Sequence, residues 1–211
     1  MKRGITPIIF VHIACMYYYK GVTKKDIPRG GGSFVDKYHD GGEVYNFAPT
    51  TVRGEDSCLG YVMLTSSSRT KLPELHLERI HGCKACNNEE TIEGVTVVFC
   101  AGEPHSCNMR VVGFYRNATV YRFVQTETLG ENSYQDYSFL AKADDCVLIP
   151  YHDRYADKRW IVPFSGKAGY DFGFGRSNLW YCDKVDENPK AMDYLMNMIN
   201  SIASYDGPNA I

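Results

Sequence analysis

The sequence predicts a mostly β fold, a closed or nearly closed barrel or sandwich with one helix at its C-terminal end. Short apolar, β-branched and aromatic runs recur along the chain, and glycine-rich or polar turns separate them. A single amphipathic stretch with helical spacing follows the last of these runs. The chain has 211 residues, a usual size for one globular unit, so we expect a single domain over residues 1–211.

The expected strands are, in chain order, residues 8–15, 43–47, 59–64, 94–101, 109–115, 119–125, 137–141, 146–149 and 159–162. Asn117 tolerates the left-handed backbone conformation, so residues 116–118 are expected to form a tight hairpin or a bulge. Residues 73–80 are expected to form a helical turn or slightly more.

Residues 188–204 are expected to form the C-terminal helix. Asn188 is a suitable N-cap, and Pro189 suits the first helical turn. The apolar side chains behind them fall on one helical face: Met192, Leu195, Met196, Ile199 and Ile202. We expect this stripe to pack against the sheet rather than to bind a partner.

The charge balance excludes a chain that coats nucleic acid without specificity. There are 23 Lys and Arg against 25 Asp and Glu, a formal net charge of −2, whereas such binding rests on many phosphate contacts. A net charge near zero is nevertheless compatible with a pocket that recognises a single base.

The N-terminal apolar run follows a basic start, as in a secretion signal, but His12 interrupts it and no small-residue cleavage site follows. We expect a buried strand there, and no stretch approaches the ~20 apolar residues of a membrane span. Four of the eight cysteines lie in or beside apolar runs, which favours free thiols and a cytoplasmic protein: Cys15, Cys100, Cys146 and Cys182.

Two motifs have alternative interpretations. Gly30-Gly31-Gly32-Ser33 is either a loop that approaches a ligand or a turn between strands; it lacks the following helix and Lys-Ser/Thr pattern of a phosphate loop. Cys83 and Cys86 form a C-x-x-C pair, with Cys100, His105 and Cys107 downstream. They are either part of a structural zinc site or two free thiols in a loop. No other cofactor is expected.

We find no complete catalytic constellation and expect no enzyme. His12 and Cys15 are three positions apart, which places them on opposite faces of a strand, and the acidic residues are scattered. Residues 166–181 are the most unusual segment, rich in glycine and aromatic residues with basic and amide groups between them. Such a segment either builds a base-stacking site or packs its aromatic residues on the sheet.

Several motifs, taken together, resemble an uncharacterised bacterial domain found ahead of HNH-type nuclease modules in restriction proteins. They are His12-Ile13, Tyr19-Lys20-Gly21, Gly30-Gly31-Gly32-Ser33, Glu43-Val44-Tyr45-Asn46-Phe47, Gly60-Tyr61-Val62, Gly94-Val95-Thr96-Val97-Val98, Val111-Val112-Gly113-Phe114-Tyr115-Arg116-Asn117-Ala118-Thr119-Val120-Tyr121-Arg122 and Arg176-Ser177-Asn178-Leu179-Trp180-Tyr181. The chain departs from that pattern at Cys15 and Phe114, where Trp is expected, and residues 83–86 look like an insertion.

By its position beside nucleases, the domain is similar in role to the PUA-like domains of EVE, YTH and SRA type, which hold a flipped modified base in an aromatic pocket. The resemblance implies a PUA-like β-barrel that binds double-stranded DNA carrying a modified base, with nuclease activity supplied by another module or partner. Two rival functions remain, an assembly domain of a defence complex and a thiol-dependent hydrolase using Cys15 or a cysteine near His105.

For the base-binding function we select three sets of candidate residues. The stacking candidates are Tyr19, Phe47, Tyr115, Trp180 and Tyr181. The candidates for the base edge are Asn46, Ser177 and Asn178, and those for phosphate are Lys167, Arg176 and Arg122. Cys83 and Cys86 are the metal candidates.

Overall fold

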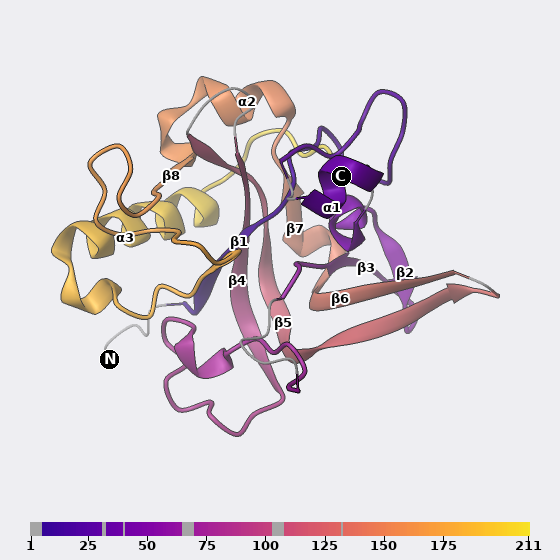
Figure 1. Cartoon of the computed structure of the whole chain (residues 1–211), viewed down its shortest axis with the longest axis horizontal. Coiled ribbons are helices and arrows are strands. Elements are labelled where there is room, and N and C mark those ends of the chain that lie inside the picture. Colours follow the sequence, from indigo (N-terminus) through magenta and orange to yellow (C-terminus); the bar gives the residue numbers. More distant parts are fainter. Residues whose placement is uncertain (1–5, 31–32, 40, 65–69, 103–107, 132) are drawn as a thin grey trace.

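The fold is mostly β, built on one large mixed sheet with a C-terminal helix beside it (Figure 1). A computed structural model describes residues 6–30, 33–39, 41–64, 70–102, 108–131 and 133–211. The strands are β1 (Ile8–His12), β2 (Thr50–Val52), β3 (Glu55–Gly60), β4 (Thr91–Gly102), β5 (Met109–Gly130), β6 (Ser133–Lys142), β7 (Cys146–Leu148), β8 (Ile161–Val162) and β9 (Leu179–Trp180). The α-helices are α1 (Ser33–Tyr38), α2 (Tyr151–Ala156) and α3 (Pro189–Ala203), and 3-10 turns lie at Gly42–Tyr45, Leu77–Arg79, Ala143–Asp145, Lys158–Trp160 and Val185–Glu187.

The strand order along the sheet is β2-β3-β6-β5-β4-β1-β9, and β7 and β8 also pair with β5. Only β1 and β4 run parallel among the paired strands described; the other pairs are antiparallel. In the part of the chain that the structure describes, β2 and β9 are not paired with each other. The sheet is therefore open, and the expected closed barrel is not seen.

The central strand β5 replaces two expected strands. Residues 109–115 and 119–125 belong to one strand, and Asn117, with φ 48°, marks an irregularity rather than a hairpin. The pairing of β4 with β5 shifts register on both sides of Val95, opposite Ala118. The bulge interpretation of residues 116–118 is therefore confirmed. Strand β5 pairs with β4, and different stretches of it pair with β6, β7 and β8.

Other strand predictions also need correction. The run at 8–15 is a strand only to His12, and residues 159–160 of the run at 159–162 belong to a 3-10 turn. Residues 43–47 contain a 3-10 turn, Gly42–Tyr45, instead of a strand. The buried carboxylate of Glu43 accepts a hydrogen bond from the Ala14 amide at 2.9 Å. This contact ties the segment to residue 14 instead of to a neighbouring strand. The run at 59–64 begins earlier, as β3, and ends at Gly60.

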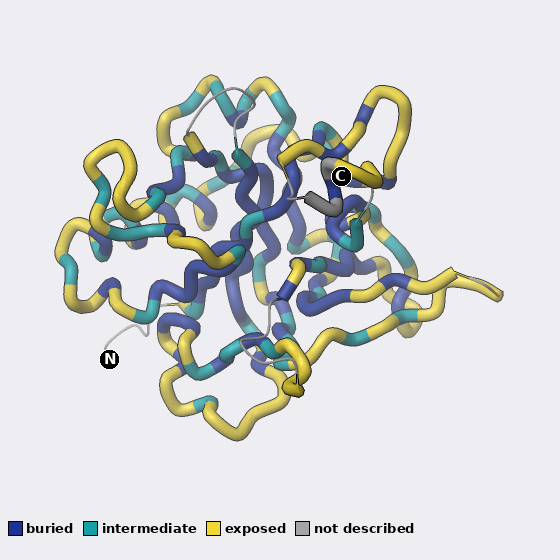
Figure 2. Tube along the Cα trace, viewed as in Figure 1, coloured by how far each residue is buried: buried dark blue, intermediate teal, exposed yellow. Residues whose placement is uncertain are grey.

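Both faces of the central sheet are covered. Ile8 and Phe10 of β1 lie in one cluster with α3, whereas Ile9 and Val11 lie in the other cluster with Phe99 and Tyr115 of β4 and β5. Because both faces of β1 are buried, its sequence is a continuous apolar run instead of an alternation of apolar and polar residues. Figure 2 shows the central strands buried, while the far end of the β5–β6 ribbon, which projects from the body, is exposed.

Helix α3 begins where the sequence predicts. The Asn188 side chain accepts hydrogen bonds from the Lys190 and Ala191 amides at 3.0 and 3.3 Å, which confirms the cap. The buried stripe is rotated from the expected one, however, and consists of Ala191, Leu195, Met198 and Ile202. Met196 is exposed, because the true stripe follows i, i+4, i+7 and i+11 and Met196 lies about 100° away from Leu195.

The described cysteines are all free thiols: Cys15, Cys58, Cys83, Cys86, Cys100, Cys146 and Cys182. Within the described residues, no helix combines the length and the apolar character needed to cross a bilayer.

Candidate functional site

The edge strand β9 is bordered by a hollow of about 520 Å³, here called the β9 hollow. Its walls come from residues 165–177, from β9 itself and from residues 183–191 at the start of α3. A smaller hollow of about 190 Å³ lies on the side of Met63 and His76. Arg79, Ser177, Leu179 and Tyr181 line both hollows, so these four residues form the wall between them.

The segment that forms the outer wall has a fixed shape. Ser165 N donates to Phe174 O at 2.7 Å, Phe174 N to Pro163 O at 3.0 Å, and Gly166 N to Tyr170 O at 2.8 Å. Gly173 has φ 106°, and a Cβ atom there would collide with the Pro163 carbonyl. Only glycine fits this position, so the glycine content of the segment serves its geometry.

An aromatic cluster forms the floor of the β9 hollow. Trp180 is 9% exposed, and its ring lies 4.7 Å from Phe10 between ring centroids. Phe172, which is half-buried, lies 6.2 Å from Trp180 and 5.9 Å from Tyr194. Trp180 therefore offers little accessible surface to the hollow, and Phe172 offers more.

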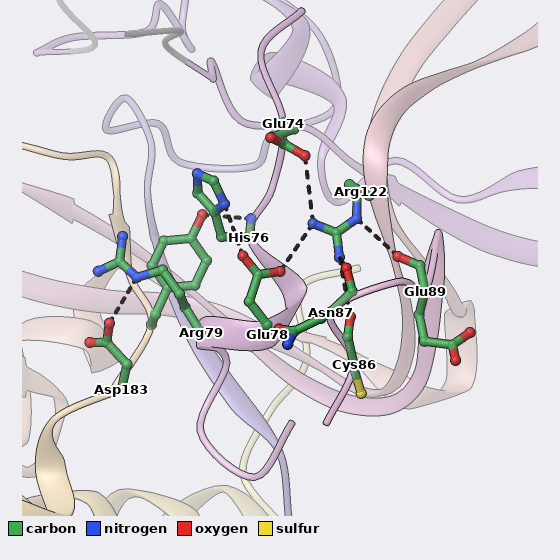
Figure 3. Close-up of polar contacts among 10 residues, drawn as sticks. Glu74, His76, Glu78, Arg79, Cys86, Asn87, Glu89, Arg122 and Asp183 are labelled. Atoms are coloured by element: carbon green, nitrogen blue, oxygen red, sulfur yellow. Dashed lines mark hydrogen bonds and ion pairs between the residues drawn. The ribbon is translucent and has the colours of Figure 1, made fainter. Parts of the chain in front are cut away.

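An arginine stacks on a tyrosine at the wall between the two hollows. The Arg79 guanidinium carbon lies 4.6 Å from the centroid of the Tyr181 ring, and Arg79 Nε donates to Asp183 Oδ2 at 2.8 Å (Figure 3). The Tyr181 hydroxyl accepts a hydrogen bond from the His76 amide at 3.1 Å, and burial raises the pKa of Tyr181. Tyr181 is 5% exposed, whereas the Arg79 side chain is 49% exposed, so about half of the Arg79 side chain remains accessible to solvent.

No family model matches the chain, and no curated protein or solved structure gives a significant match. The function of the site has to be argued from its own geometry.

Arg122 proves to be a structural tie instead of a phosphate ligand. Its guanidinium donates to the carbonyl oxygens of Cys86, Asn87 and Glu89 at 2.9–3.1 Å, and it forms ion pairs with Glu78 at 3.0 Å and Glu74 at 3.5 Å (Figure 3). These contacts occupy the polar edges of the guanidinium, and the side chain is only 11% exposed. Arg122 therefore fastens residues 74–89, which carry Arg79, to strand β5.

Four other candidates lie in the core. Tyr19, Phe47, Tyr115 and Asn46 are fully buried. Tyr19 donates its hydroxyl to Ala14 O at 2.7 Å, and Tyr115 donates to Asn46 O. The Asn46 amide donates to Tyr61 O at 3.0 Å and accepts from Tyr61 N at 2.8 Å. Their side chains are enclosed by the core, and the polar groups of Tyr19, Tyr115 and Asn46 already have hydrogen-bond partners. These four residues are therefore not base ligands at a surface.

The remaining candidates lie at or near the β9 hollow. Arg176 and Ser177 line it and are exposed, and the Ser177 hydroxyl accepts from the Leu179 amide at 3.1 Å. Asn178 lines the smaller hollow and donates to Met63 O at 3.3 Å. Lys167 lies on the same loop outside the hollow, with its ammonium 4.4 Å from the Phe164 ring centroid. The structure thus brings together Arg176, Ser177, Trp180 and Tyr181.

Among the described residues, the thiols of Cys15 and Cys83 show no sign of activation. Burial raises the pKa of the Cys15 thiol, and its sulfur lies 4.0 Å from the Tyr155 hydroxyl. Burial and the neighbouring Cys86 raise the pKa of Cys83 to about 11. These shifts disfavour the thiolate that a nucleophile requires.

The metal and glycine motifs are only partly described. No cluster of three His, Cys, Asp or Glu side chains occurs among the residues outside the gaps, and His105 and Cys107 fall within one of those gaps. Zinc therefore stays a prediction. Gly31 and Gly32 also lie outside the described residues, but a short helix, α1, does follow the motif, contrary to expectation.

Proposed function

We propose that this chain is a nucleic-acid-binding specificity module that takes one extruded, modified DNA base into the β9 hollow. The observation that carries the proposal is the Arg79–Tyr181 stack, which holds a planar cation at the wall of a hollow of about 520 Å³. That volume lies within the ~300–1,000 Å³ typical of small-molecule sites. Bases stack readily on arginine planes as well as on aromatic rings.

The energetics support a single flipped base. Extruding a base costs a few kcal/mol, and stacking contributes about 1–3 kcal/mol per base, so edge hydrogen bonds must supply the rest. Arg79 is already stacked and fixed by Asp183, which reduces the entropy lost on binding. Phe172 offers the second apolar surface.

The charges around the hollow favour a polar, uncharged ligand. Its cations are Arg79, Arg176 and Lys184, and its carboxylates are Asp171, Asp183 and Glu187. Arg79 pairs with Asp183, which leaves Asp171 and Glu187 as acceptors for an exocyclic amino group. Carboxylates accept hydrogen bonds from the amino group of cytosine, so an amino-bearing base, cytosine or adenine, fits this lining better than thymine.

The finer features of this function rest on the sequence resemblance. They are the PUA-like, partly open barrel, the association with a nuclease module or partner, and the cytoplasmic location. The pairing of β7 and β8 with β5, outside the main strand order, supports a sheet that curls toward a barrel. In this proposal the chain binds and another module cuts.

The test is an equilibrium titration of duplex DNA with and without a modified cytosine or adenine. Arg79→Ala removes both the plane and the charge, whereas Arg79→Lys keeps the charge alone. We expect both variants to lose the preference for the modified duplex by about 5- to 150-fold, the range expected for one stacked base. If Arg79→Lys binds like the wild type, charge alone suffices and the stacking role is wrong.

The second candidate function is an assembly domain, favoured by the projecting β5–β6 ribbon. Its exposed apolar side chains include Leu129 and Tyr134, the latter 73% exposed. Concentration-dependent self-association that Tyr134→Ser abolishes, with no preference among DNA ligands, would favour this candidate.

A further inference from the structure

A third hollow lies far from β9 in the sequence and has a different chemical character from the β9 hollow. It measures about 330 Å³ and is lined by Lys24, Lys25, Ile27, Pro28, Arg29 and His39. Among the described residues no acidic side chain lines it, and none of its residues lines the β9 hollow. We call it the basic hollow.

A tight turn presents the two lysines. Thr23 and Asp26 exchange backbone hydrogen bonds at 3.1 Å in both directions. The Thr23 hydroxyl also accepts from the amides of Lys25 and Asp26, at 3.3 and 3.0 Å. These four bonds fix the turn, so Lys24 and Lys25 occupy its two central, exposed positions.

The acidic residue of this turn is directed inward. Asp26 is buried, and its two carboxylate oxygens accept from the Tyr17 and Tyr18 amides at 2.7 and 2.8 Å. Within the described residues no ion pair involves Lys24, Lys25 or Arg29. The local positive charge is therefore not neutralised by the nearest carboxylate in the sequence.

Arg29 is held in place from two sides. Its backbone exchanges hydrogen bonds with Cys15 at 2.8 and 3.1 Å, and its guanidinium carbon lies 5.8 Å from the Tyr17 ring centroid. The Tyr17 ring in turn packs against Tyr151 at 4.4 Å. The fully buried Arg154 donates to the carbonyls of Met16 and Tyr17 at 2.7 Å, which ties this loop to α2.

An exposed aromatic ring adjoins Tyr17, the ring that Arg29 contacts. Tyr18 is 56% exposed and lies beside Tyr17, with 6.2 Å between ring centroids. Cations that can follow a phosphate backbone, next to an aromatic face open to a base, are the combination used to bind single-stranded nucleic acid.

We propose that the basic hollow binds the phosphodiester backbone of single-stranded nucleic acid, with Tyr18 stacking on one of its bases. Lys24, Lys25 and Arg29 contact the phosphates. The mixed charges of the β9 hollow suit a base instead, so the two hollows recognise different parts of a nucleic acid. This binding does not depend on the recognition of a modified base.

The test uses a fluorescent single-stranded oligonucleotide and its duplex, titrated at several salt concentrations. The variant Lys24→Gln/Lys25→Gln is compared with Lys71→Gln/Lys142→Gln, which removes the same charge from exposed lysines elsewhere. We expect the first variant to bind the single strand roughly 3- to 30-fold more weakly, as for two exposed ion pairs. Its log K against log salt slope should fall by about 1.4, or ~0.7 per lost contact, while the control keeps the wild-type values.

Tyr18→Ala separates stacking from charge. It should weaken single-strand binding by about 5- to 150-fold while leaving the salt slope unchanged. The proposal would be overturned if both lysine double variants lost the same single-strand affinity. It would also be overturned if the protein bound duplex more tightly than single strand and Tyr18→Ala had no effect on binding. If the wild type bound no DNA but self-associated, and Lys24→Gln/Lys25→Gln abolished that self-association, the basic hollow would be a site for a protein partner instead. Arg79→Ala should leave single-strand binding intact, so failure of the β9 proposal is distinguishable.

Discussion

Arg79 and Asp183 come from segments 104 residues apart in sequence, yet Arg79 Nε donates to Asp183 Oδ2 at 2.8 Å while the guanidinium covers the Tyr181 ring. Two other contacts position this arginine. The His76 amide donates to the Tyr181 hydroxyl, and Arg122 fastens the segment that carries Arg79 to the sheet. A planar cation is therefore oriented before any ligand arrives.

Arg122→Ala should destabilise the fold. The substitution removes the guanidinium that donates to the carbonyls of Cys86, Asn87 and Glu89, and it removes the ion pairs with Glu78 and Glu74. We therefore expect a loss of about 2–4 kcal/mol in unfolding free energy. Chemical denaturation measures it, with Arg53→Ala, an exposed arginine, as the matched control. A loss no larger than in the control would contradict the structural role of Arg122.

Gly173→Ala should distort the wall of the β9 hollow. The position has φ 106° and no room for a Cβ atom beside Pro163, so we expect a loss of about 1–3 kcal/mol. Gly175→Ala is the control, because a Cβ there meets open space. Thermal melts of both variants decide; equal melting temperatures would show that the loop is less constrained than its contacts indicate.

Glu43 should make stability depend on pH. Burial raises its pKa to about 7, partly opposed by the hydrogen bond from Ala14, so the protonated form favours the folded state. This contribution is complete below the unfolded pKa of ~4.3 and is lost as pH rises through 7, about 3 kcal/mol in total. Glu43→Gln, which stays neutral, should flatten this part of the pH profile of unfolding. An unchanged profile in the variant would exclude Glu43 as the titrating group.

Reductant should leave stability unchanged. The described cysteines are free, and most are buried among apolar side chains. Denaturation with and without dithiothreitol should give the same midpoint. A difference above ~2 kcal/mol, as expected for a native bridge, would mean that a disulfide forms after all.

Local patterns predicted the local structure well. The Asn188 cap, strands β4 and β6 and the irregularity at Asn117 follow from residue types within a few positions. The predicted buried stripe of α3 includes Met196, whereas the structure buries Met198. A helix rich in apolar residues has two overlapping apolar stripes, and the sequence alone does not separate them. Strand β9 has two residues, too few for a periodic signal.

The site was only half predictable for a physical reason. Tyr19, Phe47 and Tyr115 have the composition of a stacking pocket, yet aromatic residues fill cores equally well, and only the tertiary packing separates the two uses. Trp180, Tyr181, Arg176 and Ser177 were found because they share one short segment. Arg79 carried no such signal, since its partners lie across the fold.

The central claim is that the β9 hollow recognises a modified base, and one ratio tests it most directly. We would titrate wild-type protein and Arg79→Ala with duplexes that differ only by a modified cytosine or adenine. The account predicts tighter binding of at least one modified duplex by the wild type and a ratio near one for Arg79→Ala. Equal wild-type affinity for every duplex in a panel of cytosine and adenine modifications would contradict it.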